Sequence, residues 1–247
     1  MSIYIKYYTK KKKKDQMKHN CKKILKIFVL FLVLLSLGCG QQKKEVSQME
    51  STKAPLERLL EGNIRFQEDH PLHPDQTLDR LRELRKGQHP FAVIVSCSDS
   101  RVPPELIFDQ GLGDLFVIRN AGNLISDYEL GSIEYAVEHL DTKLIVVLGH
   151  KQCGAISAFI EHKKDSVQSH IQQIIDYIKR EPEELALEEN VSNYYEQAIN
   201  ANVAHGVHVI EQSEPVLKEY LEAGKVEVYG MLYDLETGKV ELIHNEK

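Results

Sequence analysis

Two short segments of this chain combine residue types that bind metal ions. The first is CSDSR, which begins at Cys97, and the second is GHKQCG, which contains His150 and Cys153. Cysteine thiolates and histidine imidazoles are the ligands that zinc prefers in proteins, and three of them leave a fourth position for water or substrate. That pattern is typical of a catalytic rather than a structural zinc site. The sequence therefore predicts a catalytic metal centre formed by Cys97, His150 and Cys153.

Both segments directly follow a short apolar run. FAVIVS (91–96) precedes Cys97, and LIVVL (144–148) precedes the second segment. Unbroken runs of this length, rich in Val and Ile, are typical of buried parallel strands. The carboxyl ends of parallel strands meet at one edge of a sheet, where open α/β folds bind ligands, so we expect the three side chains to come together there. A disulfide between Cys97 and Cys153 is the main alternative.

A carboxylate and a guanidinium lie beside the first candidate ligand. Asp99 is two residues beyond Cys97 and shares its side of an extended backbone. Arg101 is suited to hold that carboxylate through two parallel hydrogen bonds, which would keep it ionised and oriented. Without the neighbouring cysteine, the same pair would be interpreted as a helix N-cap with a surface arginine.

Apolar patterning predicts strands that alternate with helices. Strands are expected at 91–96, 115–119, 144–148 and 226–232. Helices are expected at 55–67, 78–86, 130–139, 154–162, 166–180, 191–212 and 215–223. After the turn DLETG, residues 239–243 are expected to pair antiparallel at the sheet edge. We therefore predict an α/β fold with a central, mostly parallel sheet flanked by helices and an antiparallel edge strand at the C-terminus.

The N-terminal region differs in composition from the rest of the chain. A Lys-rich stretch (10–26) is followed by an 11-residue apolar run and then by Cys39. The run is short for a membrane span and typical of a signal peptide, with an uncleaved membrane anchor as the alternative. SLGC resembles a bacterial lipobox, although Ser rather than Leu stands three residues before the cysteine. We predict a lipoprotein signal peptide at 1–38, lipidation of Cys39, a flexible tether at 39–54 and a catalytic domain at 55–247, exported and anchored at the bacterial cell envelope.

The charge of the chain argues against a nucleic-acid partner. Residues 1–38 hold ten Lys and one Asp, so their removal reduces 31 basic and 37 acidic residues to 21 and 36, a net charge of −15. A domain this acidic repels phosphate backbones. In an oxidising compartment, the thiols at positions 97 and 153 would tend to pair unless a metal ion holds them as thiolates.

Four stretches between Lys86 and Val240 carry a family signature: KGQHPFAVIVSCSDSRVPPELIFDQGLGDLFVIRNAGN, GSIEYAVEHL, VVLGHKQCGA and GMLYDLETGKV. Together they resemble the β-class carbonic anhydrases, and the combination of CSDSRV with GHxxCG is the most specific part. The resemblance implies a zinc enzyme that interconverts CO2 and bicarbonate by means of zinc-bound hydroxide. It also implies that Asp99, paired with Arg101, accepts a hydrogen bond from that hydroxide, or ligates zinc in a resting form. A homodimer or a larger even oligomer is implied as well.

Substrate-binding roles follow from the same resemblance. Gln88 matches a residue that donates a hydrogen bond to the substrate oxygen. Phe116 and Tyr135 match the apolar wall of the CO2 pocket, which is contributed partly across a dimer interface. Gly154 matches a glycine whose backbone N–H faces the substrate. Because Gln88 is present and the chain contains no Trp, the resemblance favours a subgroup without a noncatalytic bicarbonate site.

Two other functions remain compatible with the sequence. A hydrolase of a CO2 analogue, such as carbonyl sulfide or CS2, would use the same fold. A non-catalytic, exported binding lipoprotein would instead carry oxidised cysteines. His205 and His208 are expected to be packing or surface residues rather than metal ligands. A solvated face is expected at Glu183, Glu184, Glu188 and Glu189.

Overall fold

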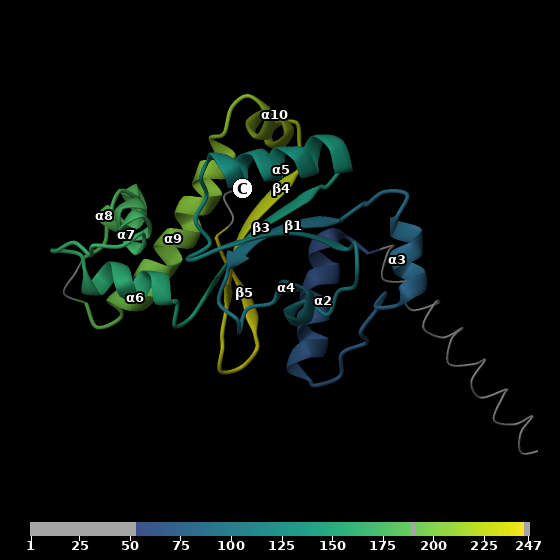
Figure 1. Cartoon of the computed structure of the whole chain (residues 1–247), viewed down its shortest axis with the longest axis horizontal. Helices are drawn as coiled ribbons and strands as arrows, with labels where there is room; N and C mark the ends of the chain where they lie inside the picture. Colours follow the sequence, from purple (N-terminus) through teal and green to yellow (C-terminus); the bar gives the residue numbers. More distant parts are fainter. Residues whose placement is uncertain (1–52, 189–190, 245–247) are drawn as a thin grey trace, which may run out of the picture. The chain divides into compact units, whose positions relative to one another are not determined.

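In a computed structural model of the chain, the described residues, 53–188 and 191–244, fold around a five-stranded sheet (Figure 1). Its strands are β1 (Ala92–Cys97), β2 (Leu115–Asn120), β3 (Leu144–His150), β4 (Glu227–Tyr233) and β5 (Val240–His244). Their order is β2-β1-β3-β4-β5. The first four pair in parallel, and β5 pairs antiparallel with β4 at one edge. The predicted fold class is confirmed.

Helices connect the parallel strands and cover both faces of the sheet. They are α2 (Pro55–Gln67), α3 (Leu78–Leu84), α4 (Pro104–Ile107), α5 (Asp127–Leu140), α6 (Gly154–Glu161), α7 (Ile171–Ile178), α8 (Pro182–Leu185), α9 (Tyr194–Glu211) and α10 (Val216–Glu222). Figure 1 shows α5, α9 and α10 on one side of the sheet and α2 and α4 on the other. The short helices α6, α7 and α8 gather beside α9.

Side chains of the central strands alternate between two apolar cores. On β1, Val93 and Val95 pack with side chains of α5, α9 and α10. Ala92 and Ile94 of the same strand pack with Leu59 of α2 and with α4. Because helices cover both faces, β1 and β3 are buried along their whole length. This double burial explains the unbroken apolar runs in the sequence.

Several element boundaries differ from the predicted ones. Strands β1 and β3 extend to the candidate ligands themselves, Cys97 and His150. Helix α5 begins at Asp127 rather than at 130, because Ser126 and Glu129 form a capping box that apolar spacing does not reveal. The helix expected at 166–180 is limited to α7, and that expected at 191–212 begins at Tyr194.

Two four-residue helices, α4 and α8, are not predicted by the apolar spacing of the sequence. Each has a proline in its first turn, which fixes a helical φ but adds no apolar period. Helix α8 also corrects one expectation: Glu184 is only 2% exposed, so its assignment to a solvated face is wrong. Glu188 is exposed, as expected, whereas Glu183 is half-buried and contacts His205 through a 2.8 Å hydrogen bond.

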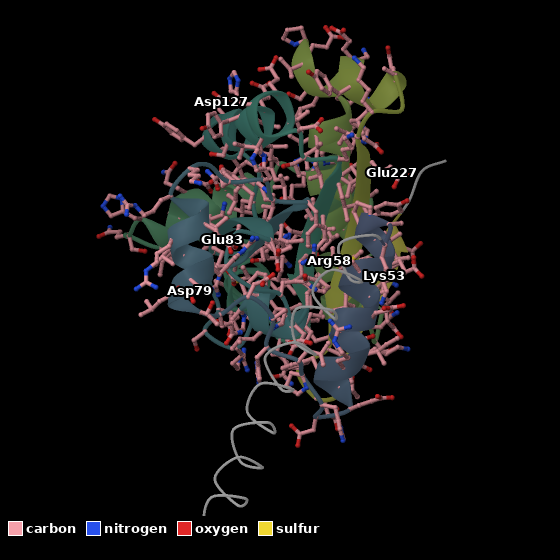
Figure 2. All side chains as sticks on the ribbon, turned by 90° about the vertical axis from the view of Figure 1, so that its right-hand side faces the viewer. Lys53, Arg58, Asp79, Glu83, Asp127 and Glu227 are labelled. Carbon is pink, nitrogen blue, oxygen red and sulfur yellow. The ribbon has the colours of Figure 1, made fainter. Side chains whose placement is uncertain are left out.

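Helix α3 is attached to the domain through polar contacts. The Arg80 guanidinium donates to the carbonyl oxygen of Leu112 at 3.0 Å. All residues of α3 lie in the described part of the chain, and none of them is buried. Leu78 and Leu81 of this helix are 70% and 50% exposed. Figure 2 shows the charged residues Asp79 and Glu83 on the surface of the same helix. This helix therefore presents apolar as well as charged side chains to the surroundings.

The predicted N-terminal features fall largely outside the described residues. These features are the signal peptide, the lipidation site at Cys39 and the tether up to residue 52. From Lys53 onward the chain forms one compact unit. Among the helices described there, none is both long and apolar enough to span a bilayer.

Candidate metal centre

Strands β1 and β3 bring the three candidate ligands to the carboxyl edge of the sheet. Cys97 ends β1, His150 ends β3, and Cys153 is the N-cap of α6. The potential ligand atoms of the three residues all lie within 4.8 Å of one another, and all three residues are buried. Both cysteines are free rather than joined in a disulfide. The structure thus assembles the predicted ligands from two distant segments of the chain.

The residue before His150 packs tightly against α9 at this edge of the sheet. A Cβ atom built on Gly149 would lie 2.4 Å from Cγ2 of Val203, a side chain of α9. The glycine that precedes the histidine in GHKQCG is therefore required by packing, because any side chain would push α9 away.

The backbone fixes which nitrogen of His150 faces the thiols. Its Nδ1 lies 2.8 Å from the carbonyl oxygen of Lys151, so Nδ1 carries the proton and donates it there. Nε2 is buried and has no hydrogen-bond partner among the described residues. A buried nitrogen in this state is costly unless a ligand occupies it. The site therefore fits a metal ion, because a metal bound by Nε2 and two sulfurs would satisfy this atom.

The two thiols differ in their electrostatic environment. The pKa of Cys97 is lowered to about 4, chiefly because Cys153 donates a hydrogen bond to its sulfur, with further donation from the backbone amides of Gly122 and Asp99 and against the opposing effect of burial. One of those amides, the N–H of Gly122, lies 3.4 Å from the Cys97 sulfur. The pKa of Cys153 is raised by its hydrogen bond to Cys97 and by burial. One thiol is thus ionised readily, and a divalent cation would stabilise the second thiolate.

Asp99 and Arg101 form the two-point contact that the sequence predicts. Nε and Nη2 of Arg101 donate to the two carboxylate oxygens of Asp99 at 3.0 and 2.8 Å, and the backbone N–H of Arg101 donates at 2.9 Å. The guanidinium holds the pKa of Asp99 well below its usual range. The Asp99 carboxylate is not part of the cluster of ligand atoms within 4.8 Å. It is an ionised hydrogen-bond acceptor beside that cluster.

A second arginine, which sequence reasoning missed, holds the backbone of the first segment. Nε of Arg119 donates to the carbonyl oxygen of Cys97 at 3.0 Å, and its Nη2 donates to that of Asp99 at 2.7 Å. Arg119 lies on β2, the neighbour of β1. The only feature of the sequence that sets Arg119 apart is its charge within an apolar strand. That feature does not indicate which backbone atoms the side chain contacts.

Helix α9 supplies two further contacts that sequence reasoning missed. The hydroxyl of Tyr195 donates to the carbonyl oxygen of Cys153 at 2.9 Å. The side-chain amide of Asn202 donates to the carbonyl oxygen of Gly122 at 3.0 Å, and the N–H of Gly122 faces the Cys97 sulfur. Asn202 is buried, so this hydrogen bond holds the backbone of Gly122, the residue whose N–H faces a candidate ligand.

The predicted substrate-binding residues fall into two groups. Gly154 begins α6 beside Cys153, and a Cβ built there would have no atom of the described chain within 4 Å. The chain itself therefore does not require a glycine at this position, and any requirement must come from a molecule that approaches it.

The other three lie toward the opposite end of the sheet. Phe116 pairs with Val93 near the start of β1, and the Phe116 ring centroid is 6.4 Å from that of Tyr135 on α5. Gln88 is exposed in the segment before β1. At the usual rise of a strand, Val93 lies about 13 Å from Cys97. Within one chain, these three residues therefore lie far from the candidate ligands.

Known proteins are similar in sequence to this chain over most of the described domain. The family model described as "Carbonic anhydrase" matches residues 92–240. A carbonic anhydrase from Mycolicibacterium smegmatis is 39% identical over 194 residues, which cover 76% of this chain and 92% of the relative. Carbonic anhydrase 2 from Mycobacterium tuberculosis is 37% identical over 191 residues, which cover 76% of this chain and 91% of the relative.

A solved structure shows the same fold. A tetrameric β-carbonic anhydrase from the ascomycete Sordaria macrospora aligns with a TM-score of 0.57 at 29% identity, over 66% of this chain and 85% of the other. The family model covers more than half of the sequence, and the bacterial relatives are similar along nearly their whole length. With the Cys-His-Cys cluster at the end of two parallel strands, these matches show that the chain belongs to the β-class carbonic anhydrases.

Proposed function

We propose that this protein interconverts CO2 and bicarbonate with a zinc ion held by Cys97, His150 and Cys153. Membership of the carbonic anhydrase family identifies the reaction as that of a carbonate dehydratase. The observation that carries the zinc assignment is the buried cluster of two sulfurs and one imidazole nitrogen. Two thiolates and an imidazole are a preferred ligand set for zinc, and three protein ligands are typical of its catalytic sites.

Zinc supplies Lewis acidity, which makes water a sufficiently strong acid to provide a nucleophile near neutral pH. The chain's own residues determine how that water is oriented. Because the pKa of Asp99 is low, its carboxylate is ionised at neutral pH and accepts a hydrogen bond rather than donating a proton. Arg101 holds both oxygens of this carboxylate, which fixes the direction from which it accepts.

A second copy of the chain is proposed to complete the substrate pocket. Within one chain, Gln88, Phe116 and Tyr135 lie far from Cys97, so they would serve the site of a partner rather than their own. The exposed leucines of α3 offer an apolar surface for such a partner. The tetrameric relative from Sordaria macrospora supports an assembly of this kind.

Export and lipid anchoring are proposed from the sequence of residues 1–54. A basic segment, a short apolar run and the sequence SLGC are together typical of a bacterial lipoprotein signal. Cleavage before Cys39 would leave a polar tether between the lipid and the catalytic domain. The enzyme would then act at the surface of a membrane in the cell envelope.

A rate measurement combined with metal analysis tests the proposed reaction. CO2 hydration by the purified protein is followed in a stopped-flow indicator assay, while zinc per chain and free thiols are counted on the same sample. We expect rapid CO2 turnover, one zinc per chain and no disulfide. Faster turnover of carbonyl sulfide or CS2 than of CO2 would favour the analogue hydrolase. Loss of both zinc and the two free thiols would favour the binding lipoprotein.

A further inference from the structure

Lys151, which lies between two of the proposed zinc ligands, connects the metal centre to the β4–β5 hairpin. Its backbone N–H donates to the carbonyl oxygen of Tyr233 at 2.9 Å. Its ammonium group donates to Oδ2 of Asp234 at 2.8 Å. Its carbonyl oxygen accepts the hydrogen bond from Nδ1 of His150 at 2.8 Å. The residue that orients the imidazole is thus itself fastened to the hairpin.

Asp234 is held at the other end of this connection by the turn between β4 and β5. Its Oδ1 accepts hydrogen bonds from the backbone N–H groups of Glu236 at 2.7 Å and Thr237 at 3.4 Å. Its backbone N–H donates to the carbonyl oxygen of Lys239 at 2.9 Å. One carboxylate oxygen therefore builds the turn, and the other reaches Lys151.

The loop between the ligands needs external contacts to keep its shape. Gln152 has a φ of 58°, in the left-handed region that residues other than glycine seldom adopt. Its neighbours are tied down on both sides, because Lys151 is paired with Asp234 and the carbonyl of Cys153 accepts from Tyr195. Such a loop relaxes when a tie is lost, and the carbonyl of Lys151 would move with it.

We propose that Asp234 is a positioning residue for the metal centre, which acts through Lys151 to hold His150 with Nε2 directed at the metal. Asp234 itself touches neither metal nor substrate. The inference rests on the proposed zinc site. The Lys151 side chain is 43% exposed, so its ion pair contributes little to the free energy of folding. Loss of the ion pair should therefore mainly weaken metal retention. Removal of contacts that orient metal ligands typically weakens metal binding about 10-fold to 100-fold.

The test compares zinc release from full-length, zinc-loaded variants to an excess of a chromogenic chelator at neutral pH. Asp234→Asn removes the charge but keeps an oxygen for the turn, and Lys151→Met removes the ammonium group. Each should release zinc roughly 10-fold faster than the wild type. The double variant should be no faster than either single one, because both break the same contact. Lys151→Arg, which retains the charge, should restore slow release.

A matched control lies on the same hairpin. The Lys239–Glu241 ion pair, at 2.6 Å, is exposed on both sides. The Glu241 carboxylate acts on Lys151 only as a more distant charge, so its removal tests the loss of a negative charge on this hairpin with the Lys151–Asp234 contact left intact. Glu241→Gln should therefore release zinc at the wild-type rate. Cobalt-substituted protein provides a second readout, because a displaced imidazole changes the visible ligand-field spectrum of Co²⁺. We expect a spectral change in Asp234→Asn and none in Glu241→Gln.

The outcomes separate a positioning role from a structural one. Release rates within twofold of the wild type for both Asp234→Asn and Lys151→Met would overturn the inference. So would a melting temperature of metal-free Asp234→Asn that falls by several degrees while the cobalt spectrum is unchanged. If the wild type bound no zinc, this inference would fail together with the proposed zinc site. Normal zinc content and CO2 turnover with unchanged release from the variants would overturn the inference alone.

Discussion

At the scale of single residues, the pairing of Asp99 with Arg101 decides what the carboxylate is able to do. Both of its oxygens accept hydrogen bonds from the Arg101 guanidinium, and Oδ1 also accepts one from the backbone N–H of Arg101. An unpaired carboxylate beside two thiols would be free to bind the proposed metal ion, whereas Arg101 holds this one as a hydrogen-bond acceptor. Lysine has no planar fork and would not hold both oxygens in the same way.

Asp99→Asn should retain zinc but lower CO2 hydration on the order of 100-fold, because the amide is no longer an anionic acceptor. Arg101→Ala should also retain zinc and lose most of the activity, since the carboxylate is then neither held nor oriented. Stopped-flow rates and zinc content measured on the same preparations check both. Zinc loss in Arg101→Ala would show instead that the arginine maintains the metal site.

Cys97→Ser and His150→Ala should each lose zinc and unfold at a lower temperature than the wild type. The reason is that metal affinity contributes to the folding free energy when the ligands are assembled only in the folded chain. Elemental analysis and thermal unfolding with and without a chelator measure the effect. His208→Ala is a suitable control, because this exposed histidine contacts only Glu183 among the described acidic groups. A Cys97→Ser protein with a full complement of zinc would contradict the ligand assignment.

The ligands could be predicted from sequence because their chemistry and their position after apolar runs agree. The residues that hold them could not. Arg119, Tyr195 and Asn202 act through backbone carbonyl oxygens of distant segments, and a contact to a backbone atom leaves no pattern in residue types. Only the fold shows which carbonyl each side chain reaches.

At the scale of elements, two carboxyl groups are buried at helix α8, one on the helix and one on the residue that precedes it. Glu181 and Glu184 are 1% and 2% exposed, and neither carboxyl group has a hydrogen-bond partner among the described residues. Burial, with the nearby acidic groups Glu184 and Glu183, raises the pKa of Glu181 to about 9. Burial raises the pKa of Glu184 to about 8, against the opposing effect of Lys163. Both groups are therefore protonated in the folded chain at neutral pH.

Stability should fall as the pH rises from about 5 toward 9. In the unfolded chain these carboxyl groups ionise near their ordinary pKa of 4.5, whereas in the folded chain they keep their protons until pH 8 to 9. The folded state binds more protons in this window, so each group lowers the free energy of unfolding by at most about 1.4 kcal/mol per pH unit. The contribution is complete below pH 4.5 and lost above the folded pKa.

Urea unfolding of the wild type and of Glu181→Gln at pH 5.5, 7 and 9 measures this dependence. The amide cannot ionise, so the variant should gain stability relative to the wild type as the pH rises. Glu188→Gln, at an exposed position near the same helix, should show no such trend. A difference between wild type and Glu181→Gln that is constant with pH would show that the buried carboxyl group does not titrate.

The types of the elements could be predicted from sequence better than the burial of these carboxyl groups. The central strands and α2 follow apolar spacing, and the bounds of α2 are those predicted. Helix α8 and the residue before it carry three glutamates within residues 181–184, a composition typical of a solvated surface. The burial of Glu181 and Glu184 accompanies packing of α8 against α9, which local sequence does not reveal.

At the scale of the whole molecule, the separation of Gln88 from Cys97 makes the proposed partner subunit testable. Light scattering should show a dimer or a larger even oligomer. Glutamates at two exposed apolar positions, Leu78→Glu with Leu81→Glu, should weaken assembly because they place charge in an apolar contact. Zinc content should be unchanged and CO2 hydration reduced. A fully active monomer would contradict a pocket shared between subunits.

The location of the enzyme is testable through Cys39. In bacterial cells, the wild type should fractionate with membranes and incorporate labelled lipid, because several acyl chains anchor a protein stably. Cys39→Ala should remove the label without a change in zinc content or specific activity. Activity in the cytosol from a chain that retains its first residues would contradict export.

The three proposed ligands come from two places in the chain that lie roughly 50 residues apart, a separation at which loop closure carries a substantial entropic cost. A metal ion that joins them acts as a cross-link between β1 and β3, which are neighbours in the middle of the sheet. Such a link restricts the unfolded chain wherever the metal stays bound to both segments. Metal supply would then set how often the sheet opens at its centre, and with it how long the enzyme survives attack by proteases.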